Sequence, residues 1–135
     1  MFKKTITYED YNGISRTEDF YFNLNRSELT KLELSQQSGY GAMMQRIIDA
    51  NDGPAIMEIF DKIVRMAYGV KSEDGRRFMK SEEISDEFAQ TPAYDSLFME
   101  LCTDSKAAAN FINGIIPADL REQAQENVVD MARKN

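Results

Sequence analysis

Hydrophobic and polar residues alternate along the first 24 residues of the chain. Two short segments carry apolar side chains at their even positions, which are Phe2, Ile6, Tyr8, Phe20, Phe22 and Leu24. A period of two residues is typical of a β-strand with one buried face. The pattern therefore predicts an N-terminal β-hairpin over residues 1–24.

The connecting sequence DYNG decides how the two strands pair. A two-residue loop of Asn12 and Gly13 would split the two apolar sets across opposite faces of the hairpin. A three-residue loop places Asp10 opposite Ile14 and keeps both sets on one face. It also puts Asp10 first and Gly13 last, in a type I turn followed by a left-handed glycine. We therefore predict the three-residue loop Tyr11-Asn12-Gly13.

From residue 25 onward, the hydrophobic residues recur at helical spacing. Asn25 followed by Glu28 has the form of a capping box and predicts a short helix to about Ser35. A second helix, ending near Asn51, is predicted from four apolar residues, Met43, Met44, Ile47 and Ile48.

The clearest helical pattern lies in the segment NDGPAIMEIFDKIVRMAYG. Pro54 suits the first helical position, and Gly69 is expected to end the helix. The three-four spacing runs through Ile56, Ile59, Phe60, Ile63, Val64, Ala67 and Tyr68. We expect this helix to be buried at the centre of the fold.

The next segment, VKSEDGRRFMK, predicts a polar excursion with a turn, compatible with a small second hairpin. Ser81 is expected to cap a short helix that runs to about Ala89. Thr91 and Pro92 start the following helix. Its apolar stripe consists of Tyr94, Leu97, Phe98, Leu101 and Cys102.

A separate short helix should follow a break near Thr103 and Asp104. Gly114 is expected to stop this helix, and Pro117 to start a last one with a frayed C-terminal end. Together the patterns predict an α+β fold that is mainly α. We expect a single domain over residues 1–135, in which the hairpin packs on a bundle of about five or six short helices.

Composition and charge narrow the class of protein. No apolar run approaches the ~18 residues that a membrane span needs, so we expect a soluble protein without membrane contact. The alternating start MFKKTITYED does not resemble a signal peptide, and a single cysteine suits a reducing cytoplasm. A net charge of −7, with only short basic pairs, argues against nucleic acid as a partner.

Candidate chemistry is sparse. Without histidine the chain has no imidazole base or metal ligand, and Cys102 is interpreted as a buried structural residue. Carboxylates that could bind magnesium occur at Glu82, Glu83, Asp86 and Glu87. Acids in the first turn after a capping serine usually serve the helix dipole instead. We assign no catalytic, cofactor-binding or metal-binding residue.

The segment NFINGIIP carries four bulky apolar residues around a predicted helix end, namely Phe111, Ile112, Ile115 and Ile116. Two alternatives remain open for them: burial under the bundle, or the edge of a groove for a partner helix. They are the candidate partner-binding residues. Eight methionines also suit an adaptable apolar surface, although methionine serves equally as core filler.

Three stretches resemble the tail assembly chaperones of long-tailed phages and prophages of Gram-positive bacteria. They are MFKKTITYEDYNGISRTEDFYFNL, NDGPAIMEIFDKIVRMAYGVKSEDGRRFMKSEEISDEF and TPAYDSLFMELCTDSKAAANFINGIIP, and they reach to about Pro117. The resemblance lies in the order of these segments, because no single motif is diagnostic. The part of the chain beyond Leu120 resembles the family least.

The resemblance implies a non-enzymatic protein, without cofactors, that coats the long tape-measure protein and keeps its apolar helices soluble. It also implies contact with the major tail (tube) protein, a longer frameshifted form of the same chain, and a place in the host cytoplasm but not in the mature virion. Self-association is a further expectation, since an empty apolar groove must be shielded. The alternative is a minor tail-structural protein, or a phage-encoded adaptor or regulator of a host protein.

Overall fold

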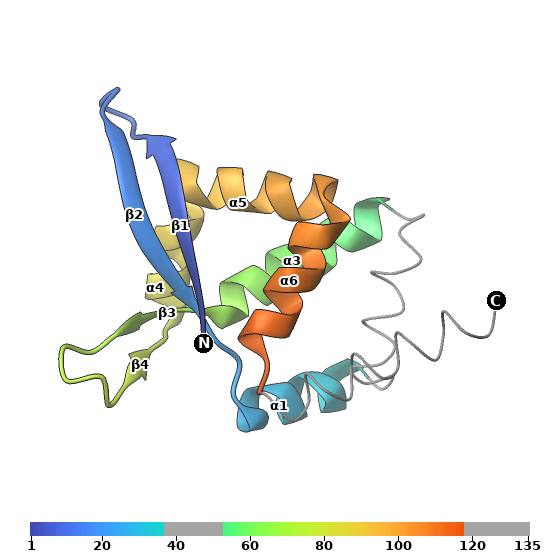
Figure 1. The fold of residues 1–135 in the computed structure, drawn as a ribbon. Coiled ribbons are helices and arrows are strands. Elements are labelled where there is room, and N and C mark those ends of the chain that lie inside the picture. The colour runs from blue at the N-terminus through green and yellow to red at the C-terminus, as the bar shows by residue number, and fades with distance from the viewer. Residues whose placement is uncertain (37–52, 118–135) are drawn as a thin grey trace.

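The computed structural model describes residues 1–36 and 53–117 (Figure 1). The elements in order are β1 (Phe2–Glu9), β2 (Ser15–Phe22), α1 (Arg26–Gln36), α3 (Gly53–Ala67), β3 (Tyr68–Lys71), β4 (Phe78–Met79), α4 (Glu82–Ala89), α5 (Pro92–Thr103) and α6 (Ser105–Ile115). The predicted α+β class is confirmed. The helices predicted to end near Asn51 and to start at Pro117 lie outside the described residues.

The three-residue hairpin loop is confirmed. Asp10 lies opposite Ile14, and its N–H donates to the Ile14 carbonyl at 2.9 Å. Gly13 adopts the left-handed conformation with φ of 79°. This register brings Phe2 opposite Phe22, so both apolar sets face the same side. The parity of the apolar positions was therefore sufficient to fix the pairing.

The polar segment after α3 forms the small second hairpin, and this hairpin extends the first one. All four strands join one antiparallel sheet in the order β1-β2-β3-β4, in which Gly69 pairs with Tyr21. The prediction that Gly69 ends the central helix is wrong, because α3 ends at Ala67 and strand pairing takes over. A Cβ atom at Gly69 would lie 2.7 Å from the Phe78 ring, so the glycine permits close packing instead.

Local capping signals place the helix starts. The Asn25 side chain accepts the Glu28 N–H at 2.9 Å, and the Glu28 carboxylate accepts the Asn25 N–H at 3.0 Å, which confirms the capping box. Ser81 and Thr91 cap α4 and α5 as predicted. Asp104 separates α5 from α6, and its carboxylate accepts the first free N–H groups of α6. The break predicted at this position is confirmed.

Gly114 does not stop α6, which continues to Ile115. The prediction of a glycine stop is wrong for a physical reason that lies outside the helix. A Cβ atom at Gly114 would come within 2.4 Å of the Phe2 ring, so the missing side chain lets β1 pack directly on α6. The Phe2 ring also meets Phe111 edge-to-face at a centroid distance of 5.4 Å.

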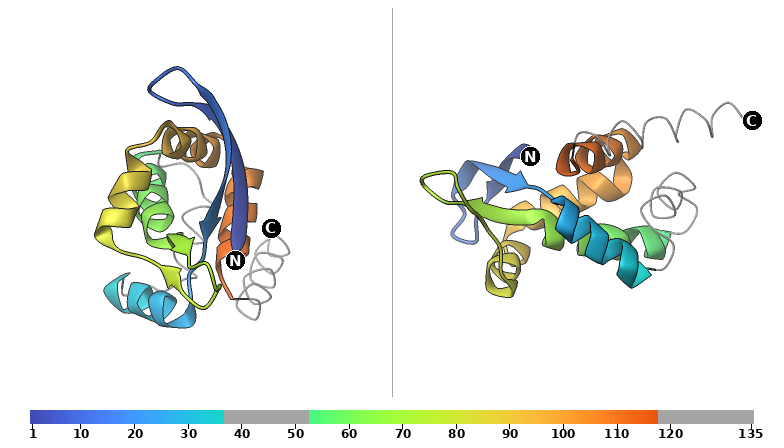
Figure 2. Two further views of the ribbon diagram at one scale, coloured as in Figure 1. Left: turned by 90° about the vertical axis from the view of Figure 1, so that its left-hand side faces the viewer. Right: turned by 90° about the horizontal axis from the view of Figure 1, so that it is seen from below.

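One hydrophobic cluster joins the sheet to the helices. The predicted central helix is confirmed, since α3 buries Ile59, Phe60, Ile63, Val64 and Ala67 in this cluster. Phe22 is 0% exposed, and its ring lies 5.3 Å from Phe111, 5.7 Å from Tyr68 and 5.8 Å from Phe88. Figures 1 and 2 show that the tip of the first hairpin projects beyond the helices, outside this core.

Candidate functional site

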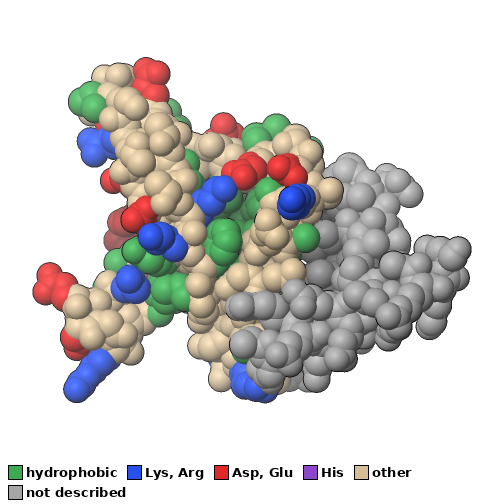
Figure 3. Space-filling model, viewed as in Figure 1, with side chains coloured by type: hydrophobic (Ala, Val, Ile, Leu, Met, Phe, Trp, Pro, Cys, Tyr) green, Lys and Arg blue, Asp and Glu red, His purple; other side chains and the backbone are tan. Residues whose placement is uncertain are grey.

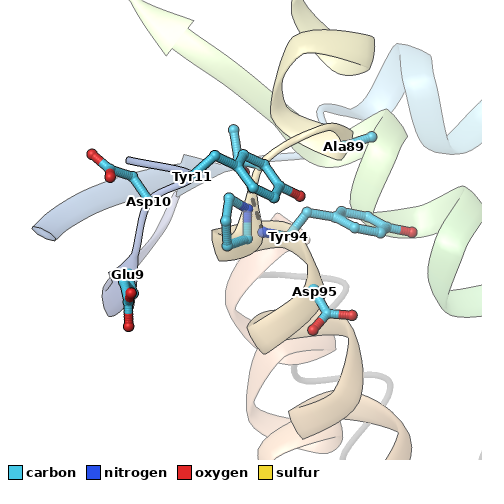
Figure 4. A pocket seen from close by; sticks show the side chains of 8 residues that line it. Glu9, Asp10, Tyr11, Ala89, Tyr94 and Asp95 are labelled. Carbon is cyan, nitrogen blue, oxygen red and sulfur yellow. Dashed lines mark hydrogen bonds between the residues drawn. The ribbon is translucent and has the colours of Figure 1, made fainter. Parts of the chain in front are cut away.

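An open groove lies beneath the projecting hairpin tip (Figure 4). Its volume is about 640 Å3. One wall comes from the hairpin loop, and the other from the junction of α4 and α5. The lining residues are Glu9, Asp10, Tyr11, Ala89, Thr91, Pro92, Tyr94 and Asp95.

The hairpin tip presents two large apolar side chains to solvent. Tyr11 is 84% exposed and Ile14 is 55% exposed. Figure 4 shows the Tyr11 ring turned into the groove, with the carboxylates of Glu9 and Asp10 pointing away from that ring. Because turns are normally built from polar residues and glycine, large apolar residues here are typical of a contact surface.

Asp10 holds the tip in one conformation. Its carboxylate accepts the N–H groups of Asn12 and Ile14 at 2.9 and 3.0 Å, and it pairs with Arg16 at 2.6 Å. The hydrogen bond from Arg16, together with those backbone bonds, lowers the pKa of Asp10. The loop is therefore ordered by its own side chains before any partner binds, which reduces the entropy lost on binding.

The opposite wall of the groove is anchored by Tyr94. Its hydroxyl donates a hydrogen bond to Asp61 of α3, and Arg65 pairs with the same carboxylate at 3.0 Å. Burial, reinforced by the bond to Asp61, raises the pKa of Tyr94 to about 12. The phenol thus stays protonated at neutral pH and serves as a donor that ties α5 to α3.

Replacing Asp61 should lower the stability by an amount that depends on pH in a defined direction. Burial raises the pKa of Asp61. The hydrogen bonds from Tyr94 and Arg65 and the charge of Arg65 lower it by a larger amount, so the pKa lies below its ordinary value. A lowered pKa stabilises the fold above the ordinary value of 3.8, and this contribution is lost as the pH falls through the folded value. Asp61→Asn should reduce the free energy of unfolding at pH 7 by less than about 1 kcal/mol, because water screens the partly exposed carboxylate.

Urea unfolding at pH 7 and near pH 3 measures this effect. The difference between wild type and Asp61→Asn should shrink at the lower pH. Asp95→Asn, a change at an exposed carboxylate of α5, is the matched control and should leave the free energy of unfolding within about 0.5 kcal/mol of wild type at both pH values. A difference that stays constant with pH would contradict the assignment.

A second, smaller groove of about 170 Å3 lies between β1, α5 and α6. It is lined by Phe2, Lys4, Leu97, Glu100, Leu101, Ala107, Asn110 and Phe111. Leu97, Leu101 and Phe111 form an apolar floor, and they are themselves buried in the core. Lys4 and Glu100 form a salt bridge of 2.9 Å at the rim.

The predicted partner-binding residues lie in the core of the described chain. Phe111, Ile112, Ile115 and Ile116 are each 1–2% exposed. Phe111 lines the smaller of the two grooves described here, where it forms part of the floor. The structure gathers these residues in one hydrophobic cluster, as the burial alternative describes, and their contact with a partner stays a prediction. The exposed Tyr11 and Ile14 were not among the predicted site residues, although their place in a turn was a usable signal.

The residues considered for catalysis or metal binding do not form a site in the described part of the chain. Cys102 is half-buried, and burial raises the pKa of its thiol, which disfavours the reactive thiolate. The four acids of α4, Glu82, Glu83, Asp86 and Glu87, are exposed, and Asp86 pairs with Arg65 at 3.3 Å. Across residues 1–36 and 53–117, no three side chains of histidine, cysteine, aspartate or glutamate gather as metal ligands would.

Charges on the surface are mixed. On the described part of the face in Figure 3, basic side chains are interspersed with acidic ones. Within the same described residues, no helix has the length and apolar character to cross a membrane.

A small α+β protein with apolar residues on an ordered hairpin tip and two open grooves has the features of a protein-binding module. Comparison with known families specifies which module this is. The profile of the phage tail assembly chaperone family matches residues 1–135, so the chain belongs to that family. Membership supports a chaperone role in the assembly of phage tails. Comparisons with curated proteins and with solved structures gave no match.

Proposed function

We propose that this chain binds the tape-measure protein, keeps it soluble and assists assembly of the tail tube, without catalysing a reaction. The observation that carries the proposal is membership of the tail assembly chaperone family over the whole chain. The net charge of −7 supports it, because strong net charge keeps a complex with an apolar partner soluble. The proposed place of action is the host cytoplasm, before the virion is complete.

The groove beneath the hairpin tip is the contact surface that we favour. Tyr11 lines this groove from one side and Pro92 from the other, and Ile14 adds exposed apolar area at the hairpin tip. Glu9 and Asp95 add negative charge at the groove. This combination suits an amphipathic helix whose apolar face meets the tip and whose lysine or arginine residues meet the acids.

Co-expression with the tape-measure protein tests both the function and the surface. Wild type should raise the soluble fraction of the tape-measure protein several-fold, and a Tyr11→Ser, Ile14→Ser variant should lose most of this gain. The variant should fold normally, since both side chains are largely exposed. Met99→Ser is the matched control, because Met99 is 48% exposed on α5 and does not line the groove.

A tape-measure protein that is equally soluble with and without this chain would refute the function. If the Met99→Ser control fails to keep the tape-measure protein soluble while the tip variant still does so, the proposed contact surface is wrong and the proposed function still stands. Mass spectrometry of purified virions separates the chaperone from a minor tail-structural protein, because the chaperone should be absent. The same co-expression strain can be used to recover the other proposed partners, which are the tail-tube protein, a longer frameshifted form and a second copy of the chain.

A further inference from the structure

β1 is the edge strand of the sheet, and one side of its backbone has no strand of residues 1–36 or 53–117 beside it. Hydrogen-bonded and non-hydrogen-bonded pairs alternate in an antiparallel ladder, and the bond from Asp10 to Ile14 marks the even positions of β1 as the bonded ones. The backbone groups at the odd positions therefore point away from β2. They belong to Lys3, Thr5, Thr7 and Glu9, and no other backbone group of the described chain pairs with them.

The odd-numbered side chains of β1 lie on the solvent face of the sheet. Lys3, Thr5, Thr7 and Glu9 are all exposed. The strand contains neither a proline nor a bulge, two devices by which proteins prevent unwanted pairing at an edge. An unpaired row of N–H and C=O groups is complementary to one kind of ligand above others, an extended polypeptide.

The smaller groove lies directly beside this edge. Lys4 lines it from β1, and Ala107 and Phe111 line it from α6. A cavity of roughly 150 Å3 can hold a benzene ring, so a groove of about 170 Å3 fits one aliphatic side chain. A strand added to the edge would alternate its side chains, and those on the inner side would face this apolar floor.

We propose that the open edge of β1 binds an extended segment of a partner protein as a fifth, antiparallel strand, with an aliphatic side chain in the groove. The charges on β1 define the segment further. Lys3 favours an acidic residue opposite it, and Glu9 favours a basic one. The proposal does not depend on tape-measure binding at the hairpin tip, which involves helical partner segments and shares Glu9 with this edge.

A second copy of the chain, paired through its own β1, is the competing occupant of this edge. It would make the chain a dimer in the absence of any peptide. Light scattering of the full chain separates the two occupants, because a dimer that Thr7→Pro converts to a monomer would overturn the proposal.

A designed peptide probes the edge directly. The acetylated and amidated peptide Lys-Val-Thr-Val-Thr-Leu-Glu, paired antiparallel, places its lysine opposite Glu9, its leucine opposite Lys4 and its glutamate opposite Lys3. In NMR titration of the full chain, it should shift the amide signals of Thr5 and Thr7 and slow their hydrogen exchange. N-methylation of the first threonine, whose N–H would face β1, should abolish binding. N-methylation of the second valine, whose N–H would face away, should leave it intact.

Thr7→Pro and Thr17→Pro form a matched pair on the protein side. The two threonines lie opposite each other, and their hydroxyls share a hydrogen bond of 3.0 Å. Both N–H groups point outward, but towards opposite edges of the hairpin, so neither proline removes a bond between β1 and β2. Thr7→Pro should weaken peptide binding at least tenfold, whereas Thr17→Pro should stay within twofold of wild type.

Ala107→Phe supplies a test that leaves the hairpin unchanged, because the larger side chain would fill the groove from α6. It should also weaken binding at least tenfold. Equal effects of the two prolines, equal binding of the two N-methylated peptides, or no binding at millimolar peptide would each overturn the proposal. These outcomes leave the solubility of the tape-measure protein untouched, so the two proposals fail separately.

Discussion

Ile112→Asp is expected to prevent the chain from folding. Ile112 is 1% exposed on the inner face of α6, within a cluster that contains no buried polar or charged residue among those described. The change would remove an aliphatic side chain, at a cost of about 2–5 kcal/mol. It would also bury a carboxylate without a partner, which costs several kcal/mol more or forces protonation. Together these effects rival the whole stability of a domain, about 5–15 kcal/mol.

Circular dichroism and thermal unfolding of the purified variant measure this outcome. Asn110→Asp is the matched control, because Asn110 lies on the same helix, two residues away, and is exposed. It should melt within a few degrees of wild type. If the aspartate variant cannot be purified, Ile112→Ala can be measured instead, and its free energy of unfolding should be lower than that of wild type by about 2–5 kcal/mol.

The experiment also decides between the two roles predicted for the stripe on α6. Loss of folding in Ile112→Asp, and likewise in Ile116→Asp, identifies these residues as core. A variant that folds normally but no longer keeps the tape-measure protein soluble would instead identify a partner groove that opens by movement of α6. The second result would contradict the burial seen here.

Signals that act over a few residues were sufficient to predict much of the fold. The hairpin register follows from the parity of apolar positions on either side of one turn. The helix starts at Arg26, Glu82 and Pro92 follow from side chains that bond to N–H groups within three residues. In each case the cause and its effect lie in the same short segment.

The two glycines that were wrongly predicted to stop helices show the limit of prediction from local sequence patterns. Gly69 and Gly114 both follow apolar helical patterns, and a glycine there normally indicates a helix stop. Their actual role is to admit the rings of Phe78 and Phe2. Phe2 comes from the opposite end of the chain to Gly114, and no local pattern records that approach. The pairing of Gly69 with Tyr21, which adds the second hairpin to the sheet, is equally non-local.

The candidate site was missed for a related reason. The apolar stripe on α6 is buried in one cluster with residues of the sheet and of other helices, and the contact between Phe2 and Phe111 depends on the space that Gly114 leaves. Exposure of Tyr11 and Ile14 follows from the projection of the hairpin beyond the helices, a property of the assembled fold. Apolar character alone does not distinguish a side chain that the fold covers from one that it leaves exposed.

Phe22→Ala should cause the second large loss of stability, about 3–5 kcal/mol. The Phe22 ring joins three parts of the core, since it meets Tyr68 of β3, Phe88 of α4 and Phe111 of α6. Two of these contacts, with Phe88 and Phe111, are edge-to-face pairs, which contribute about 0.5–1.5 kcal/mol each beyond the area they bury. The sheet cannot close over the cavity without separating from the helices, because the neighbouring backbone N–H groups of Asn23 and Leu24 are bonded to Ala67 and Ile115.

Urea unfolding gives the free-energy difference, and the melting temperature should fall by about 10 °C or more. Tyr21→Ala is the matched control, because Tyr21 is adjacent in β2 but points to the opposite face, where its ring lies under Lys71. Its loss should stay near 1 kcal/mol or below, within the usual range for a partly exposed site. Equal losses at the two positions would mean that the core is not organised around Phe22, and that β2 contributes through its backbone pairing alone.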